Sequence, residues 1–183
     1  MVDIALIEQC KNPNVPTEII QKIILIESNN NQFAINVNGI GSFILKTKEE
    51  AKEKINYYLS KNASVDIGLM QFNSNNLKLK AFSSYSVDDL LDTCKNIKAG
   101  SDVFYLAYES TDKNLSEKER INQALSVYNT GNITNGFLNG YVAKYDSNLN
   151  IKNINEEARK SNTKINIAFN LFNLETLKNE KAQ

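Results

Sequence analysis

The stretch that decides the fold is "TEIIQKIILIESNNNQFAINVNG", residues 17–39. Its first half predicts a helix over residues 17–29, because Ile20, Ile23 and Ile24 recur at the spacing of one helical face. Glu27 is the next position on that face. The second half is rich in Asn and Gly and predicts a loop or a short strand. The sequence therefore places one carboxylate at the end of an otherwise apolar helix face.

Glu27 has two interpretations at this point. A carboxyl group on an apolar face loses hydration, and this raises its pKa. A carboxylic acid that is still protonated near neutral pH can donate a proton to a glycosidic oxygen. The alternative is a Glu at a fraying helix end whose side chain turns to solvent. This stretch alone leaves both open.

The composition excludes several kinds of chemistry. The chain has 183 residues, 42% of them hydrophobic, which suits one compact globular domain. Lys+Arg and Asp+Glu balance at 21 each, so the net charge gives no indication of a nucleic-acid partner. Histidine is absent, which rules out Ser-His-Asp and Cys-His catalysis and His-based metal sites. We predict no metal, no cofactor and, since no apolar run is long enough, no membrane span.

The rest of the chain reads as mainly helical. A short helix should begin at the Asp3 cap, and a later one at Ser116, where Glu119 completes a capping box and Gly131 ends the helix. Residues 64–73 predict a brief strand or extended segment. Further helices are expected over residues 46–62, 75–81, 87–110 and 136–149. The two cysteines, Cys10 and Cys94, are either free buried thiols or one disulfide.

Three later segments bear on Glu27. They are "DIGLMQFN" (66–73), "ALSVYNTGN" (124–132) and "NGYVAKY" (139–145). Each is a weak signal alone, since the first could be a tight turn and the second a helix end. Together with Glu27–Ser28, and in this order, they closely resemble the catalytic domain of soluble lytic transglycosylases, which have a goose-lysozyme-like fold and cleave peptidoglycan. The resemblance covers roughly residues 5–148.

The resemblance can be narrowed to one branch. Residues 40–65 form an insert between "AINVNG" and "DIGLMQ", and "DTCKNIKAG" follows at 92–100. This arrangement resembles the branch attached to type IV secretion and conjugation machines, which tends to carry cysteines where Cys10 and Cys94 stand. The resemblance thus implies a disulfide and a periplasmic location. The first ten residues lack the features of a secretory signal, so we expect that one has been removed.

The family implies an architecture and a catalytic acid. It predicts a mainly α (α+β), lysozyme-like fold with a small β region near residues 33–72. Residues 1–150 would form the catalytic domain, and residues 151–183 a polar extension, helical or partly disordered. Glu27 matches the sole catalytic acid, which protonates the oxygen between N-acetylmuramic acid and N-acetylglucosamine. The 6-hydroxyl of the muramic acid then closes on the anomeric carbon, giving a 1,6-anhydro product.

The other site residues are also implied by the resemblance. Tyr141 matches the Tyr that holds the acid in place, and Ser28 supports the helix end. In the family, one wall of the sugar cleft is formed by the residues that match Gly68, Leu69, Met70 and Gln71. The other side is shaped by the residues that match Tyr128 and Asn129. Asn36 is a departure, because general soluble enzymes often have Ser there, near the acetamido group.

Two alternatives remain open. Asp66 could be a second carboxylate, which would favour lysozyme-type hydrolysis over transglycosylation. More simply, it braces the extended segment. The chain could also be a weakly active wall-binding assembly factor. In each case the expected partners are peptidoglycan glycan strands and secretion-system components, with no nucleic acid.

Overall fold

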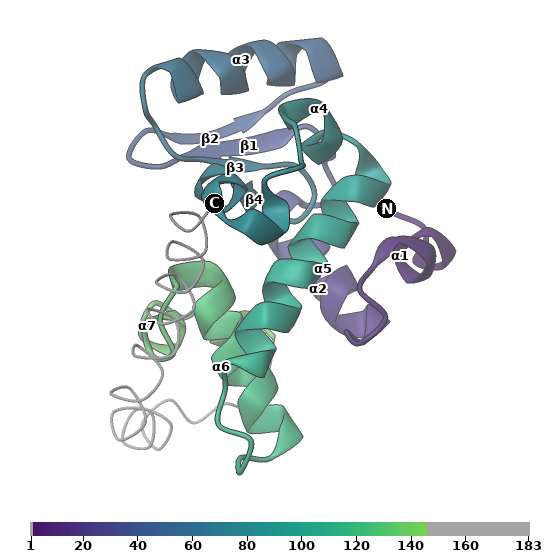
Figure 1. Ribbon diagram of the computed structural model, residues 1–183, viewed down its shortest axis with the longest axis vertical. Coiled ribbons are helices and arrows are strands. Elements are labelled where there is room, and N and C mark those ends of the chain that lie inside the picture. Colours follow the sequence, from purple (N-terminus) through teal and green to yellow (C-terminus); the bar gives the residue numbers. More distant parts are fainter. Residues whose placement is uncertain (1, 146–183) are drawn as a thin grey trace, which may run out of the picture. The chain divides into compact units, whose positions relative to one another are not determined.

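The structure is a computed structural model of the chain, and it describes residues 2–145. The expected extension over residues 151–183 lies outside the described residues. The chain divides into two compact units, Met1–Asp102 and Val103–Gln183, which are taken in turn. Helices with a small four-stranded antiparallel sheet confirm the predicted fold class (Figure 1).

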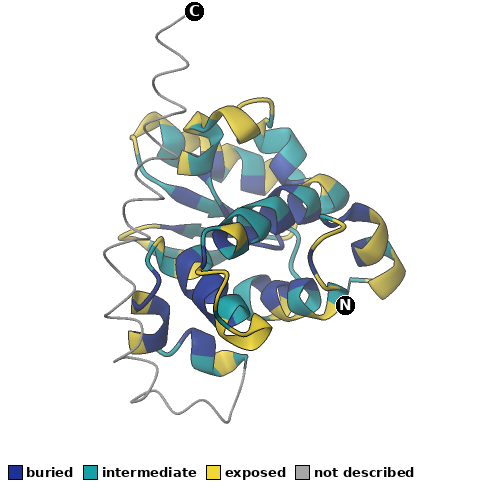
Figure 2. Cartoon of the chain, turned by 60° about the horizontal axis from the view of Figure 1, so that its bottom comes forward, coloured by how far each residue is buried: buried dark blue, intermediate teal, exposed yellow. Residues whose placement is uncertain are grey.

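The helices of the first unit begin and end close to where the sequence predicts. Asp3 caps α1 (Ile4–Cys10) by accepting a hydrogen bond from the Ala5 N–H at 2.9 Å. Apart from Ile7 and Cys10, α1 is not buried (Figure 2). The decisive helix is α2 (Thr17–Ser28), and the three isoleucines of its predicted face are 0% exposed. The other helical segments of the unit are α3 (Lys48–Ser60), α4 (Val87–Leu90), and the 3₁₀ turns η1 (Ser74–Lys78) and η2 (Lys80–Phe82).

The sheet has one apolar and one polar face. Its strands are β1 (Ala34–Val37), β2 (Gly41–Ile44), β3 (Val65–Ile67) and β4 (Phe72–Asn73), in the order β2-β1-β3-β4. Side chains alternate between the faces, and Ile35, Ile67 and Phe72 share a buried row. Phe43, paired with Ile35, packs against Tyr58 of α3. Helix α3 therefore covers the apolar face (Figure 1).

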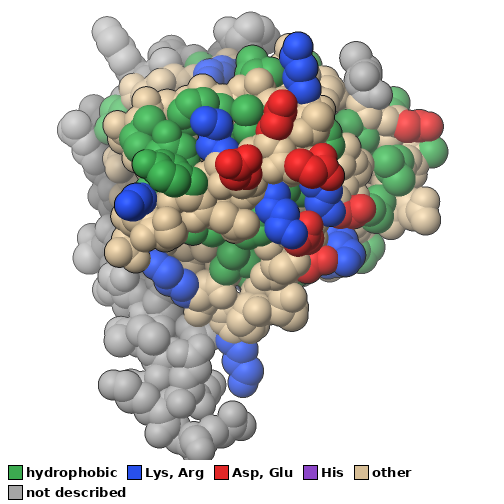
Figure 3. Space-filling view, turned by 90° about the horizontal axis from the view of Figure 1, so that it is seen from above, with side chains coloured by type: hydrophobic (Ala, Val, Ile, Leu, Met, Phe, Trp, Pro, Cys, Tyr) green, Lys and Arg blue, Asp and Glu red, His purple; other side chains and the backbone are tan. Residues whose placement is uncertain are grey.

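Ion pairs and a disulfide tie the first unit together. Lys48 and Lys52 of α3 both contact Asp88 of α4. Figure 3, which views the molecule from the side where α3 lies in Figure 1, shows acidic and basic side chains interspersed on this face. Cys10 and Cys94 form a disulfide between α1 and α5 (Thr93–Glu109), which confirms the pairing that the resemblance implied. The boundary between the two units falls within α5.

The second unit confirms one helix prediction and corrects another. Helix α6 (Glu117–Thr130) has the predicted capping box at Ser116 and ends at Gly131, whose φ is 67°. The single helix predicted over residues 136–149 is wrong in its described part, which consists of α7 (Asn135–Leu138) and the 3₁₀ turn η3 (Val142–Lys144). The break falls at Gly140, whose φ of 80° is incompatible with a right-handed helix.

Within residues 2–145, each helix is too short or too polar to cross a lipid bilayer.

Candidate active site

Glu27 lies in the last turn of α2 and is partly buried. The helix ends directly after it, because Asn29 and Asn30 have φ values of 49° and 64°. Ser28 is buried, and its hydroxyl donates a hydrogen bond to the Ile24 carbonyl at 2.9 Å. Such a bond back into the preceding turn fixes the helix end. This geometry supports the interpretation of Ser28 as a structural neighbour of the acid.

The segment from Gly68 to Gln71 is the tight turn between β3 and β4. The Gln71 N–H donates to the Gly68 carbonyl at 3.1 Å, and both Gly68 and Gln71 have positive φ, 77° and 48°. Leu69 and Met70 are 1% and 0% exposed, so their side chains anchor the turn in the core. The Gln71 amide donates to the carbonyls of Gly68 (2.9 Å) and Ala34 (3.1 Å), which ties the turn to β1.

Asn96, on the neighbouring helix α5, holds this turn in place. The sequence analysis did not single out this residue. Its side-chain oxygen accepts a hydrogen bond from the Met70 N–H at 2.9 Å, and its NH₂ donates to the carbonyls of Ile67 (2.9 Å) and Leu90 (2.8 Å). The residue is 1% exposed. A Cβ atom on Gly68 would lie 2.4 Å from the Asn96 nitrogen. The signal in the sequence was an Asn within the apolar pattern of α5, because a buried amide needs hydrogen-bond partners.

A row of polar side chains crosses the second, polar face of the sheet. Ser42, Asn36, Asp66 and Asn73 are paired in register across the four strands. The Ser42 hydroxyl donates to the Asn36 oxygen at 3.1 Å. The amides of Asn36 and Asn73 each donate to one oxygen of Asp66, at 3.0 and 2.6 Å. The side-chain amide of Asn36 is thus already hydrogen-bonded to a carboxyl group.

Asp66 is the titratable member of this row. Burial raises the pKa of its carboxyl above the ordinary value, while the hydrogen bonds from Asn36 and Asn73 oppose part of that rise. The two amides also fix the orientation of the carboxyl group. Asp66 is therefore a carboxyl group whose protonation is perturbed by its surroundings.

In the second unit, a side-chain hydrogen bond connects the two motif segments, residues 124–132 and 139–145. The Asn139 amide donates to the side-chain oxygen of Asn129 at 3.0 Å, and the Asn139 oxygen accepts from the Tyr141 N–H at 2.9 Å. Tyr128 packs against Phe104, with ring centroids 6.2 Å apart. Tyr141 is 4% exposed, and its hydroxyl oxygen lies 2.8 Å from that of Tyr145.

The predicted site residues thus fall into two groups. Glu27, Ser28, Asn36 and residues 68–71 belong to the first unit. Tyr128, Asn129 and Tyr141 belong to the second. Within each group, hydrogen bonds connect segments that are separate in the sequence.

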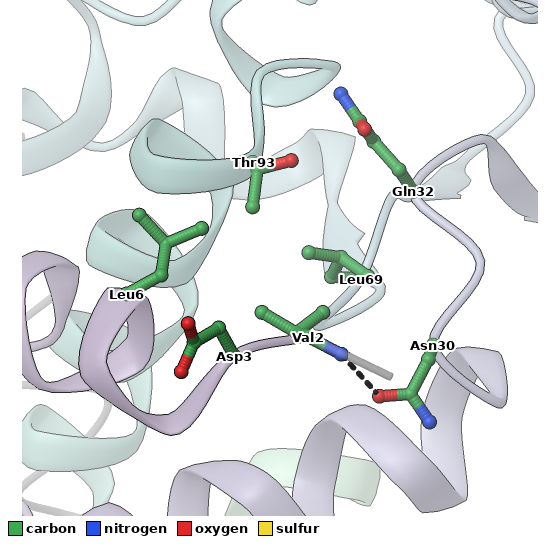
Figure 4. A pocket seen from close by; sticks show the side chains of 7 residues that line it. All are labelled: Val2, Asp3, Leu6, Asn30, Gln32, Leu69 and Thr93. Carbon is green, nitrogen blue, oxygen red and sulfur yellow. Dashed lines mark hydrogen bonds between the residues drawn. The ribbon is translucent and has the colours of Figure 1, made fainter.

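An open pocket in the first unit lies beside α1 (Figure 4). The Asn30 side-chain oxygen accepts a hydrogen bond from the Val2 N–H at 3.2 Å at its edge. Of the predicted site residues, only Leu69 is among those that line it: Val2, Asp3, Leu6, Asn30, Gln32, Leu69 and Thr93. Glu27 is not among the residues that line this pocket, although Asn30 and Gln32, which follow it in the chain, are.

Comparison with known proteins defines the class. Residues 5–151 match the family described as "Transglycosylase SLT domain". Because this match covers most of the chain, the chain belongs to that family, as its motifs indicated. No solved structure matches it.

The relatives narrow the comparison further. The chain is 29% identical over 136 residues to "Protein virB1" of Rhizobium radiobacter, covering 74% of this chain and 56% of the relative. It is 30% identical over 139 residues to "Type IV secretion system protein virB1" of Brucella abortus biovar 1 (strain 9-941), covering 73% and 56%. The chain thus spans about half the length of the curated relatives it matches. These relatives are in keeping with the branch that the sequence motifs resembled.

Proposed function

We propose that this protein is a peptidoglycan lytic transglycosylase that opens the cell wall locally for a type IV secretion or conjugation apparatus. The observation that carries the proposal is the match of residues 5–151 to the transglycosylase family. The printed name of the Brucella relative supports the link to type IV secretion. The finer assignments below rest on the family resemblance and on the geometry of each unit.

The proposed reaction uses Glu27 twice. In the first step Glu27 donates its proton to the oxygen between N-acetylmuramic acid and N-acetylglucosamine, and the carbon–oxygen bond to the anomeric carbon breaks. The acetamido oxygen of the substrate assists at that carbon. In the second step the Glu27 carboxylate takes the proton of the 6-hydroxyl. The 6-oxygen bonds to the anomeric carbon, so a 1,6-anhydro sugar forms without water.

The surrounding residues would position these groups. In this proposal the Tyr141 hydroxyl holds the acid, and Asn129 and Tyr128 shape one side of the cleft. Gly68 and Gln71 would form the opposite wall, with the buried Leu69 and Met70 behind it. Asn36 would contact the acetamido group, but its amide already donates to Asp66, so we expect it to work as part of the polar row.

The proposal also covers organisation and location. Residues 1–150 would act as one catalytic domain, and residues 151–183 would form a polar C-terminal extension of it. The disulfide supports a periplasmic location, because such bonds persist in oxidising compartments. The partners would be peptidoglycan glycan strands and components of the secretion system.

A lysozyme-type hydrolase is the second candidate. The observation in its favour is Asp66, whose carboxyl is held by two amides and has a raised pKa. In a two-carboxylate scheme this group would stabilise the anomeric carbon or activate water, and the product would have an ordinary reducing end. The products of the two candidate reactions therefore differ in mass by one water molecule.

Mass spectrometry of digested peptidoglycan distinguishes these possibilities. Wild type, Glu27→Gln and the control Glu18→Gln, an exposed carboxyl on the same helix, should be compared. We expect products one water lighter than hydrolytic fragments from wild type and Glu18→Gln, and none from Glu27→Gln. Products of hydrolytic mass would favour the lysozyme-type reaction and lead to Asp66→Asn. Glycan binding without products from any variant would favour a wall-binding assembly factor.

A further inference from the structure

We propose that Tyr145 is a positioning residue that sets the direction of the hydrogen bond from Tyr141. This inference rests on the proposed function, in which the Tyr141 hydroxyl holds the catalytic acid. Tyr145 follows Tyr141 by four residues and stands at the end of η3. Neither the sequence motifs nor the family match assigns it a role.

The geometry clamps Tyr141 at both ends. Its backbone N–H donates to the Asn139 side chain at 2.9 Å, and its hydroxyl oxygen lies 2.8 Å from that of Tyr145. The two rings have centroids 5.4 Å apart and are tilted by 53°. Because Tyr141 is 4% exposed, water has little access to compete for this contact. The Tyr145 hydroxyl is thus a fixed part of the surroundings of Tyr141.

The contact between the hydroxyls has a direction. A phenol hydroxyl carries one proton and can also accept, so one of the two tyrosines donates and the other accepts. If Tyr145 donates, Tyr141 can direct its own proton to a second acceptor. Receiving a hydrogen bond also polarises the Tyr141 O–H group and makes it a stronger donor.

A nearby cation also strengthens Tyr141 as a hydrogen-bond donor. The Lys144 ammonium lies 5.5 Å from the centroid of the Tyr141 ring. A positive charge there stabilises negative charge that builds up on the Tyr141 oxygen when its proton is shared with an acceptor. The acceptor in the proposed reaction is the Glu27 carboxylate that forms after the first proton transfer. Tyr145 would therefore stabilise that carboxylate through Tyr141, without contacting the substrate.

The test is a double-mutant cycle on activity. Wild type, Tyr145→Phe, Tyr141→Phe and the double variant should be compared in kcat, KM and pH profile, with Tyr105→Phe as a partly exposed control from the same unit. Tyr145→Phe should lower kcat by about five-fold with KM unchanged, the effect of one hydrogen bond. In the Tyr141→Phe background it should have no further effect. Tyr105→Phe should match wild type.

The pH profile reports the direction of the bond. A weaker donor to the carboxylate raises the pKa of Glu27, so the alkaline limb of kcat should move to higher pH in Tyr145→Phe. A shift to lower pH would mean that Tyr141 donates to Tyr145 and would overturn the proposal. An equal loss of kcat with and without the Tyr141 hydroxyl would overturn it too, as would a loss of thermal stability that accounts for the loss of activity.

Failure of the proposed function would look different. In that case wild type itself would yield no anhydro products, or Glu27→Gln would remain active. The inference about Tyr145 fails separately, when wild type is an active transglycosylase and Tyr145→Phe gives one of the contradicting results above.

Discussion

The turn at residues 68–71 and the segment around Tyr141 are both family motifs, yet they are held in opposite ways. The turn is fixed by residues far away in the sequence, namely Asn96 of α5 and Ala34 of β1. The Tyr141 segment is fixed by near neighbours, Asn139 and Tyr145. Substitutions around the turn should therefore act on stability, whereas substitutions around Tyr141 should act on chemistry. Four sets of variants test this difference, and they follow in order of decreasing effect.

Loss of the disulfide should have the largest effect on stability. Cys94 lies two residues before Asn96, and the bond to Cys10 closes a loop with a sequence separation of 84. In the chain-entropy model such a loop stabilises the folded state by roughly 4–5 kcal/mol. Cys10→Ser with Cys94→Ser should lower the free energy of unfolding by about that amount in urea titrations. Equal stability of the oxidised and reduced wild type would contradict this prediction.

Two glycines with nearly equal φ provide the next comparison. A Cβ on Gly68 (φ 77°) would lie 2.4 Å from Asn96 and 2.8 Å from the Leu90 carbonyl, whereas Gly140 (φ 80°) has open space around it. Gly68→Ala should lower the free energy of unfolding by about 4 kcal/mol, since strain adds to the clash. Gly140→Ala should cost only about 1 kcal/mol. Chemical denaturation measures the free energy of unfolding of both variants. Equal losses would show that the neighbouring atoms move and relieve the clash at Gly68.

Two asparagines test the same contrast with hydrogen bonds. Asn96 and Asn139 each accept from a motif N–H, but Asn96 is buried and Asn139 is exposed. Asn96→Ala removes three buried hydrogen bonds, one from the Met70 N–H and two to backbone carbonyls, and should cost about 3 kcal/mol of unfolding free energy. Asn139→Ala should cost below about 1 kcal/mol, because water replaces the bond. If Asn139→Ala lost more unfolding free energy than Asn96→Ala, the prediction would be wrong.

The smallest effect concerns the pH dependence of Asp66. Since burial raises the pKa of this carboxyl, the folded state binds its proton more tightly than the unfolded chain does. Its effect on folding is most favourable below the unfolded pKa and is lost as pH rises through the folded pKa. Relative to wild type, Asp66→Asn should therefore gain stability as pH increases from acidic to neutral. Urea titrations over this range check it, with Glu53→Gln, an exposed carboxyl on α3, as the matched control variant.

The sequence was informative wherever the determining interactions are local. The Asp3 and Ser116 caps and the end of α6 at Gly131 were predicted correctly, because each depends on hydrogen bonds or backbone angles within a few residues. The helix predicted over residues 136–149 was wrong in its described part, because the apolar pattern continues across Gly140 although the backbone changes direction there. The apolar face of α2 was also predicted correctly, since helical spacing alone assigns it.

By itself, the sequence determined the family, the acid at the end of α2 and the order of the motifs around it, because these are properties of residue type and spacing. The folded structure was needed to show that Asn96 holds the turn and that Asn36 and Asp66 share a row on the polar face of the sheet. Strand register decides which side chains become neighbours across a sheet, and burial decides which polar groups need a partner. Both arise from contacts between distant residues, which no local pattern of residues contains.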